Sequence, residues 1–248
     1  MKKILAPIAL SLVLIFAGCE NQSDISTEPE LLQKEANFGD NEGQLEKRNG
    51  YAEFKITLEN LTPATGPGAS QPLSPPVITT HTPLFHVFQK HKYASSELAQ
   101  VAEDAFNGPL INLLNSSNLA YDVVEGTTGP IFPGEAETFM VKAKFPFKKL
   151  SLVSMLVNTN DGFTGIDAAK LPLFGSREYY LHAYDAGSEK NTELMANIPG
   201  PCCGSPFVRV PSNQRIKKHK GIRGNGDLDP NKYGWDGYAA KLTITRVN

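Results

Sequence analysis

The sequence predicts an all-β fold, an antiparallel β-sandwich with one or two short helices. Apolar and polar residues alternate with a period of two in several separate segments. The chain also has 21 Gly and 18 Pro, which suits the many turns of such a fold. Only one segment shows clear helical spacing. The folded domain is expected to span residues 51–248, because the composition changes at Tyr51.

Five segments have the pattern of strands. Residues 51–61 alternate, residues 150–157 are apolar on both faces and suit a central strand, and residues 177–184 are rich in aromatics. Residues 137–145 and 239–247 alternate again. The residues expected on one buried face of the 137–145 strand are Phe139, Val141, Ala143 and Phe145.

One helix is predicted within residues 93–106. Ser95 or Ser96 can cap its start, and an apolar stripe follows at helical spacing. The run Asn107-Gly108-Pro109 is expected to end it. The helix should therefore pack on a sheet.

The first 50 residues predict export and attachment to a membrane. Lys2 and Lys3 precede an apolar stretch, and residues 1–18 are interpreted as a signal peptide. The run IFAGC resembles the lipobox of bacterial lipoproteins, with Cys19 as the lipidated residue; an ordinary cleaved signal and an uncleaved anchor are the alternatives. Residues 19–50 carry many acids and little apolar content, as in a lipid-anchored disordered tether.

Composition and motifs exclude several classes of function. A net charge of -2 argues against a general role in binding nucleic acid. The sequence has no phosphate-binding Gly-rich loop, no nucleophile elbow, no His-Glu-x-x-His zinc motif and no EF-hand loop. We therefore predict a protein that is not an enzyme. The rival is a surface hydrolase that would use Asp161, Asp185, His81 or His182 for acid–base chemistry.

Cys202 and Cys203 are adjacent in the sequence. In an oxidising compartment they are expected to form a vicinal disulfide across a tight turn, with free thiols or intermolecular pairing as the alternatives.

Three acids follow predicted strands and point to a metal site. Asp161 follows the 150–157 strand, and Asp185 and Glu189 follow the 177–184 strand. If those strands pair so that their ends meet, three carboxylates converge, and a bound cation would offset their repulsion. Oxygen ligands favour Ca²⁺. Each acid can instead stabilise a turn. His81, His86 and His91, and the pair Asp227 and Asp229, are weaker candidates for metal ligands.

Five segments, in this order, resemble the spondin N-terminal (Spondin_N) domain family, known from F-spondins, mindins and bacterial proteins. They are SPPVITTHT, ASSELAQVAEDAF, LVSMLVNTNDGFTGIDAAKL, YDAGSEKNTEL and AAKLTITRV. The resemblance implies a sandwich related to C2 domains, with Ca²⁺ held by Asp161, Asp185 and Glu189. Glu189 stands where the family usually has Asp, and Gly162-Phe163 stand where a Trp usually follows the first acid.

The sequence and the resemblance together predict an envelope-tethered, calcium-binding adhesion or recognition module. Its expected location is the bacterial cell envelope, on the outer membrane or on the periplasmic or extracellular face. Its expected partners are the membrane, through the lipid anchor, and an unknown protein or polysaccharide ligand.

Overall fold

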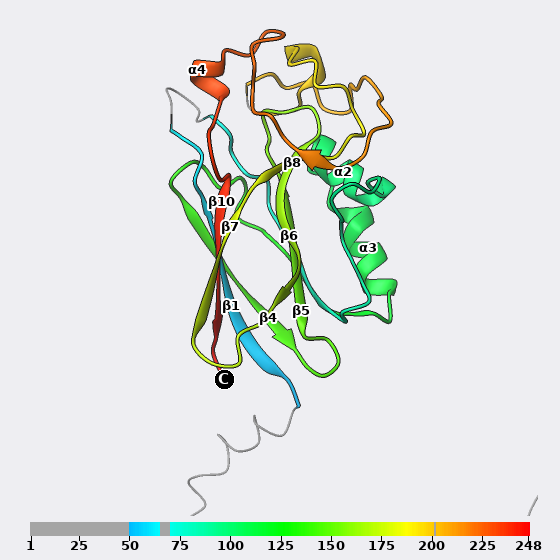
Figure 1. Cartoon of the computed structure of the whole chain (residues 1–248), viewed down its shortest axis with the longest axis vertical. Helices are drawn as coiled ribbons and strands as arrows, with labels where there is room; N and C mark the ends of the chain where they lie inside the picture. The colour runs from blue at the N-terminus through cyan, green and yellow to red at the C-terminus, as the bar shows by residue number, and fades with distance from the viewer. Residues whose placement is uncertain (1–49, 65–69, 201) are drawn as a thin grey trace, which may run out of the picture. The chain divides into compact units, whose positions relative to one another are not determined.

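The computed structural model describes residues 50–64, 70–200 and 202–248, and it shows two antiparallel sheets packed face to face (Figure 1). The all-β sandwich is confirmed. The expected signal peptide, Cys19 and all of the expected tether except Gly50 lie outside the described residues. Within the described part of the chain, no helix is long and apolar enough to cross a membrane.

The first sheet has four strands in the order β4-β1-β10-β7. Its strands are β1 (Ala52–Asn60), β4 (Ala136–Ala143), β7 (Ser176–Leu181) and β10 (Ala240–Arg246). Along β1 and β10, buried residues alternate with more exposed ones, so one face of this sheet lies against the core, as the sequence predicts.

The second sheet has six strands in the order β3-β2-β5-β6-β8-β9. Its strands are β2 (Val77–His81), β3 (Ala120–Glu125), β5 (Lys149–Met155), β6 (Gly162–Lys170), β8 (Ala183–Asp185) and β9 (Lys217–Lys218). Residues 150–155 of β5 are buried on both faces, which confirms that the strand is central.

Helices α2 (Ser96–Asp104) and α3 (Gly108–Ser116) cover the outer face of the six-stranded sheet (Figure 1). Helix α2 and its Ser95 cap match the sequence prediction. The run Asn107-Gly108-Pro109 was expected to end the helix, but α2 already ends at Asp104, where Ala105 takes the left-handed conformation. Gly108 and Pro109 instead begin α3, which was not predicted and where Pro is favoured in the first turn. A four-residue helix, α4 (Pro230–Tyr233), and a 3-10 turn at Met195–Asn197 add to the predicted set.

Two apolar clusters stabilise these layers. One lies between the sheets and includes Ile56, Leu152 and Leu242, all fully buried. The other lies between the six-stranded sheet and the helices and includes Leu98 and Phe163. Burial of such side chains contributes about 1.5–3 kcal/mol each. The molecule therefore has a sheet–sheet–helix arrangement with a core in each interface.

Two details differ from the sequence analysis. The expected 177–184 strand is divided, because β7 belongs to the four-stranded sheet while β8 belongs to the six-stranded sheet. The chain crosses between the sheets at His182. Phe145 was expected to share the buried face of Phe139, but it follows the end of β4 and is 78% exposed.

Candidate carboxylate site

The pairing of β6 with β8 brings Asp161 and Asp185 together. Gly162 and Asp185 are partners in this ladder, and the N–H of Ala186 donates to the carbonyl oxygen of Asp161 at 3.0 Å. In the sequence analysis, convergence of the acids was conditional on pairing between the 150–157 strand and the strand before Asp185. The structure places β6 between them, and Asp161 immediately precedes β6.

Asp161 is fully buried and has one oxygen engaged and one free. Its Oδ2 accepts hydrogen bonds from the N–H groups of Ser188 and Glu189, each at 2.9 Å, and from Ser188 Oγ at 3.3 Å. Its Oδ1 is buried without a hydrogen-bond partner. An unpaired buried carboxylate oxygen is costly unless the group is protonated or meets a cation.

Asp185 is buried as well, but both of its oxygens are engaged. Its Oδ1 accepts from the N–H of Gly187 at 2.8 Å, and its Oδ2 accepts from Asn191 Nδ2 at 2.6 Å. The amino group of Lys217 lies 3.3 Å from the same Oδ2. In this arrangement Asp185 stabilises the turn after β8.

Glu189 lies in a group of acids around a single arginine. Its Oε2 is buried without a hydrogen-bond partner, and its Oε1 lies 4.0 Å from Arg209 Nε. Arg209 also contacts Glu103 at 2.6 Å and Asp104 at 3.1 Å, both at the end of α2. The sequence analysis missed Glu103 and Arg209, because acids along a helix and a lone arginine in a loop carry no motif.

The buried acids have strongly shifted pKa values. The pKa of Asp161 is raised to about 7, first by burial and then by the charge of Asp185, although the hydrogen bonds from residues 188 and 189 oppose the rise. The pKa of Glu189 is raised to about 8 by burial and by the charges of Glu103 and Asp161, against the effect of Arg209. Both side chains therefore keep their protons to a higher pH than an ordinary carboxyl group, unless a cation replaces the proton.

The fit to a cation is uneven across the three predicted ligands. Asp161 Oδ1 and Glu189 Oε2 are buried, hard oxygen donors without a hydrogen-bond partner, whereas both oxygens of Asp185 are engaged. Among the described residues, no group of three or more His, Cys, Asp or Glu side chains is placed so that it could hold a metal ion. Two of the three predicted residues therefore offer an atom to Ca²⁺ in this arrangement.

The histidines of the rival interpretations have other contacts. His81 is fully buried, with Nδ1 bonded to the carbonyl oxygen of Thr82 and Nε2 to Ser151 Oγ, both at 2.8 Å. Ser151 Oγ also donates to Asp167, which contacts His86 Nδ1 at 2.5 Å. His182 stacks on the Tyr238 ring.

The other candidates have structural roles. Cys202 and Cys203 are joined by a disulfide bond. Asp229 caps α4 by accepting from the N–H of Asn231, and Asp227 accepts from the N–H of Met195. These two aspartates stabilise turns, which was one of the two interpretations of their spacing.

The family model named Spondin_N matches residues 59–202, which is more than half of the 248 residues. The chain belongs to the Spondin_N family. The matched residues include β2, α2, β6 and all three acids. A search of curated proteins found no match to this chain.

Membership in Spondin_N indicates an extracellular domain of the adhesion or recognition type, from a family that is not catalytic. The match ends before β9 and β10, yet β10 completes the four-stranded sheet between β1 and β7. The Spondin_N domain of this chain therefore extends structurally beyond the matched residues.

Proposed function

We propose that this chain is a non-catalytic adhesion or recognition domain that is stabilised by Ca²⁺ and tethered to the bacterial cell envelope through lipid on Cys19. Its ligand is a protein or a polysaccharide. Family membership supports the recognition role. The observation that carries the calcium proposal is the pair of buried, unpaired oxygens on Asp161 and Glu189.

Asp161 and Glu189 would supply side-chain oxygens to the ion, and loop carbonyls and water would complete its coordination. Asp185 would join them if Lys217 and Asn191 released its Oδ2. The ion would supply positive charge where two acids are otherwise held protonated. Its role would be to order the loop after β8 and the end of α2, where the surrounding acids gather.

Calcium titration of the chain tests this proposal. Wild type should melt about 5–10 °C higher at Ca²⁺ concentrations near 100 times the dissociation constant, because binding to the folded state adds about 2.7 kcal/mol. A chelator should reverse the rise. Asp161→Asn should remove the response, whereas Asp227→Asn, which alters an acid of another turn, should keep it. Calcium binding is rejected if wild type melts identically in Ca²⁺ and in chelator.

The tether is tested separately by metabolic labelling with a radioactive fatty acid. The wild-type chain should incorporate the label and sediment with membranes. Cys19→Ser should lose the label and appear in the soluble fraction. A labelled Cys19→Ser chain would show that the lipid is attached elsewhere.

A further inference from the structure

Three loops meet at the end of the sandwich that lies opposite the carboxylates. His81 pairs with Lys149, and Lys149 pairs with Lys170, so the residues beyond these positions lie at one edge of the six-stranded sheet. We call residues 82–86, 144–149 and 170–177 the basal loops; the last two ranges include the adjoining ends of β5, β6 and β7. Figure 1 shows that the C-terminus lies at this end, whereas β8, which ends at Asp185, lies at the other.

The basal loops carry the most exposed large apolar side chains among the described residues. These are Phe174 at 85%, Leu84 at 82%, Leu173 at 79% and Phe145 at 78% exposed, and the next, Phe207, is at 65%. They come from three separate loops. Because exposed apolar groups are unfavourable in water, their concentration at one end indicates a surface that is covered in use.

The basal loops are also strongly basic. They contain five Lys or Arg residues and no Asp or Glu. The cations are Lys144, Lys148, Lys149, Lys170 and Arg177. Two loops repeat the same chemistry in sequence, as Lys-Phe-Pro-Phe-Lys-Lys at 144–149 and Lys-Leu-Pro-Leu-Phe at 170–174. Cations beside exposed aromatic and aliphatic groups are typical of surfaces that bind anionic membranes.

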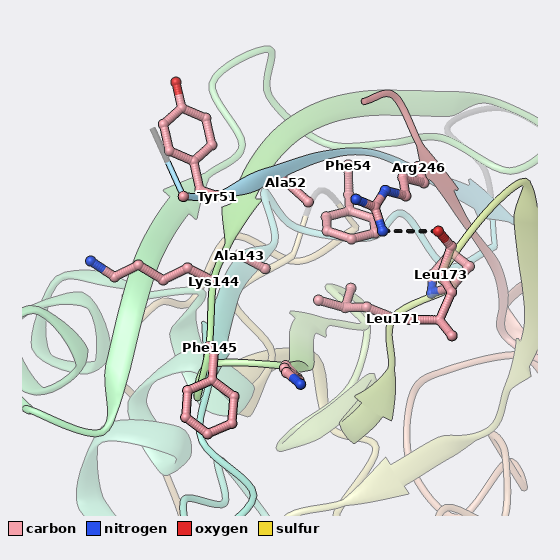
Figure 2. A pocket seen from close by; sticks show the side chains of 12 residues that line it. Tyr51, Ala52, Phe54, Ala143, Lys144, Phe145, Leu171, Leu173 and Arg246 are labelled. Carbon is pink, nitrogen blue, oxygen red and sulfur yellow. Dashed lines mark hydrogen bonds between the residues drawn. The ribbon is translucent and has the colours of Figure 1, made fainter. Parts of the chain in front are cut away.

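A pocket of about 340 Å³ lies between two of these loops and β1. Figure 2 shows Tyr51, Lys144 and Phe145 on one side of the pocket and Arg246, Leu171 and Leu173 on the other. Arg246 Nη1 donates to the carbonyl oxygen of Leu173 at 2.8 Å and so holds the 170–177 loop to β10. Lys148 lies 4.8 Å from the centre of the Phe145 ring. Charge and apolar surface are thus held together by ordered contacts.

The chain enters the domain at this same end. Ala52, at the start of β1, pairs with Ala143, the last residue of β4, and Gly50 and Tyr51 line the pocket. Thirty residues separate Cys19 from Gly50, so a lipid on Cys19 lies at most about 110 Å away along the chain. A domain held this close to a bilayer meets it at a high effective concentration.

We propose that the basal loops dock on an anionic phospholipid bilayer, so that the carboxylate end of the sandwich is directed away from the membrane. Phe145, Leu173 and Phe174 enter the interface between headgroups and acyl chains. Lys144 and Lys148 contact headgroup phosphates at the mouth of the pocket. The proposed lipid tether supports this orientation, but docking requires only the chemistry of the loops.

Vesicle co-sedimentation tests the proposal with a chain that begins at Glu20 and so lacks the lipid. All strands of both sheets lie within residues 52–246, so a chain that begins at Glu20 keeps the whole sandwich. The probes are vesicles of phosphatidylcholine alone and vesicles with equal parts of phosphatidylglycerol, both in chelator. Wild type should bind the anionic vesicles and not the neutral ones, and added salt should weaken the binding.

Two pairs of matched variants locate the surface. Leu173→Ser with Phe174→Ser should weaken binding at least about tenfold, whereas Phe207→Ser, which removes an exposed aromatic next to Asp104 at the other end, should not. Lys144→Gln with Lys148→Gln should weaken binding about 25-fold, at about fivefold for each cation. Lys218→Gln with Lys220→Gln, which changes the net charge equally, should have no such effect. Unchanged melting temperatures would show that the variants fold.

Three results would overturn the proposal. In the first, the wild-type chain does not bind the anionic vesicles. In the second, the basal variants and their controls lose vesicle binding equally. In the third, the wild-type chain binds no vesicles but self-associates, and Phe174→Ser abolishes that self-association. The last result would assign the surface to a second copy of the chain. The assay contains neither Ca²⁺ nor lipid on Cys19. Absence of vesicle binding would therefore reject membrane docking without rejecting the proposed calcium-stabilised recognition domain. Loss of the calcium response would likewise leave membrane docking untouched.

Discussion

The N–H of Glu189 donates a 2.9 Å hydrogen bond to Asp161 Oδ2, across 28 positions of sequence. This bond and its neighbour from Ser188 join the start of β6 to the loop after β8. They also fix which oxygen of Asp161 stays free. The same contact therefore stabilises the fold and sets the chemistry of the site.

The stability of the metal-free chain should fall as the pH rises from 6.5 to 8. Asp161 and Glu189 have pKa values near 7 and 8 in the folded state, above the ordinary values near 4 in the unfolded state. The folded chain then binds more protons than the unfolded chain, so raising the pH favours unfolding. His219 opposes this fall slightly up to about pH 7.5. Burial lowers its folded pKa to about 4, while the unfolded chain still binds protons near the ordinary pKa of 6.5.

Melting curves in chelator at several pH values measure this effect. Wild type should lose stability on the order of a few kcal/mol across the range. The double variant Asp161→Asn, Glu189→Gln should lose much less. An equally steep fall in the double variant would assign the titration to other groups.

Asp185→Asn should lower the pKa of Asp161. The charge of Asp185 is the second cause of the raised value, after burial, and Asn removes that charge while keeping an oxygen for Gly187. Carbon-13 NMR titration of the Asp161 carboxyl measures the shift directly. An unchanged Asp161 titration would mean that burial alone sets its pKa.

Asp185→Ala should also lower the melting temperature in Ca²⁺ and remove the response to chelator, if Asp185 is a ligand as the family pattern implies. A variant that keeps a full calcium response would leave Asp161 and Glu189 as the binding residues. It would assign Asp185 to the turn in which the structure places it.

Arg209→Ala should destabilise the fold by about 1–3 kcal/mol, because it removes hydrogen bonds to charged groups and leaves Glu103 buried without its cation. Arg177→Ala, which removes an exposed cation from β7, should change the free energy of unfolding by less than about 0.5 kcal/mol. Urea denaturation measures both. Equal effects of the two substitutions would contradict a special role for Arg209.

Gly162→Ala should destabilise the start of β6 by roughly 1–3 kcal/mol. A Cβ at this position would overlap Thr159 Oγ1, which accepts from the Gly162 N–H at 2.8 Å and donates to the carbonyl oxygen of Leu156. Gly108→Ala is the control, since the nearest atom to its Cβ would lie 3.9 Å away. It should be neutral or slightly stabilising in chemical denaturation. A destabilised control would mean that loss of glycine alone explains the effect.

Much of the fold could be predicted from the sequence, because apolar and polar residues alternate along a strand that is buried on one face only. This alternation indicated β1, β4 and β10, whose side chains point in turn to the core and to the outer face. It missed β2 and β6, because β2 is buried throughout and the first four residues of β6 are buried without a break, so neither alternates. It also misplaced Phe145, since alternation continues past Ala143 although the sheet does not.

The proximity of the three acids could be expected only in outline. Spacing placed Asp161, Asp185 and Glu189 at the ends of strands, but pairing between β6 and β8 is a property of the whole sheet. Which oxygens are free depends on N–H groups from the 186–189 loop and on Arg209, and no local pattern encodes those contacts.

The position of β1 has a mechanical consequence for a protein that would be held at one end and loaded at the other. β1 lies between β4 and β10 and is antiparallel to both. A pull on Tyr51 along the strand axis would have to slide two ladders of hydrogen bonds at once, rather than peel one bond at a time. Force entering near the pocket would thus be spread over the middle of the four-stranded sheet before any strand could leave it.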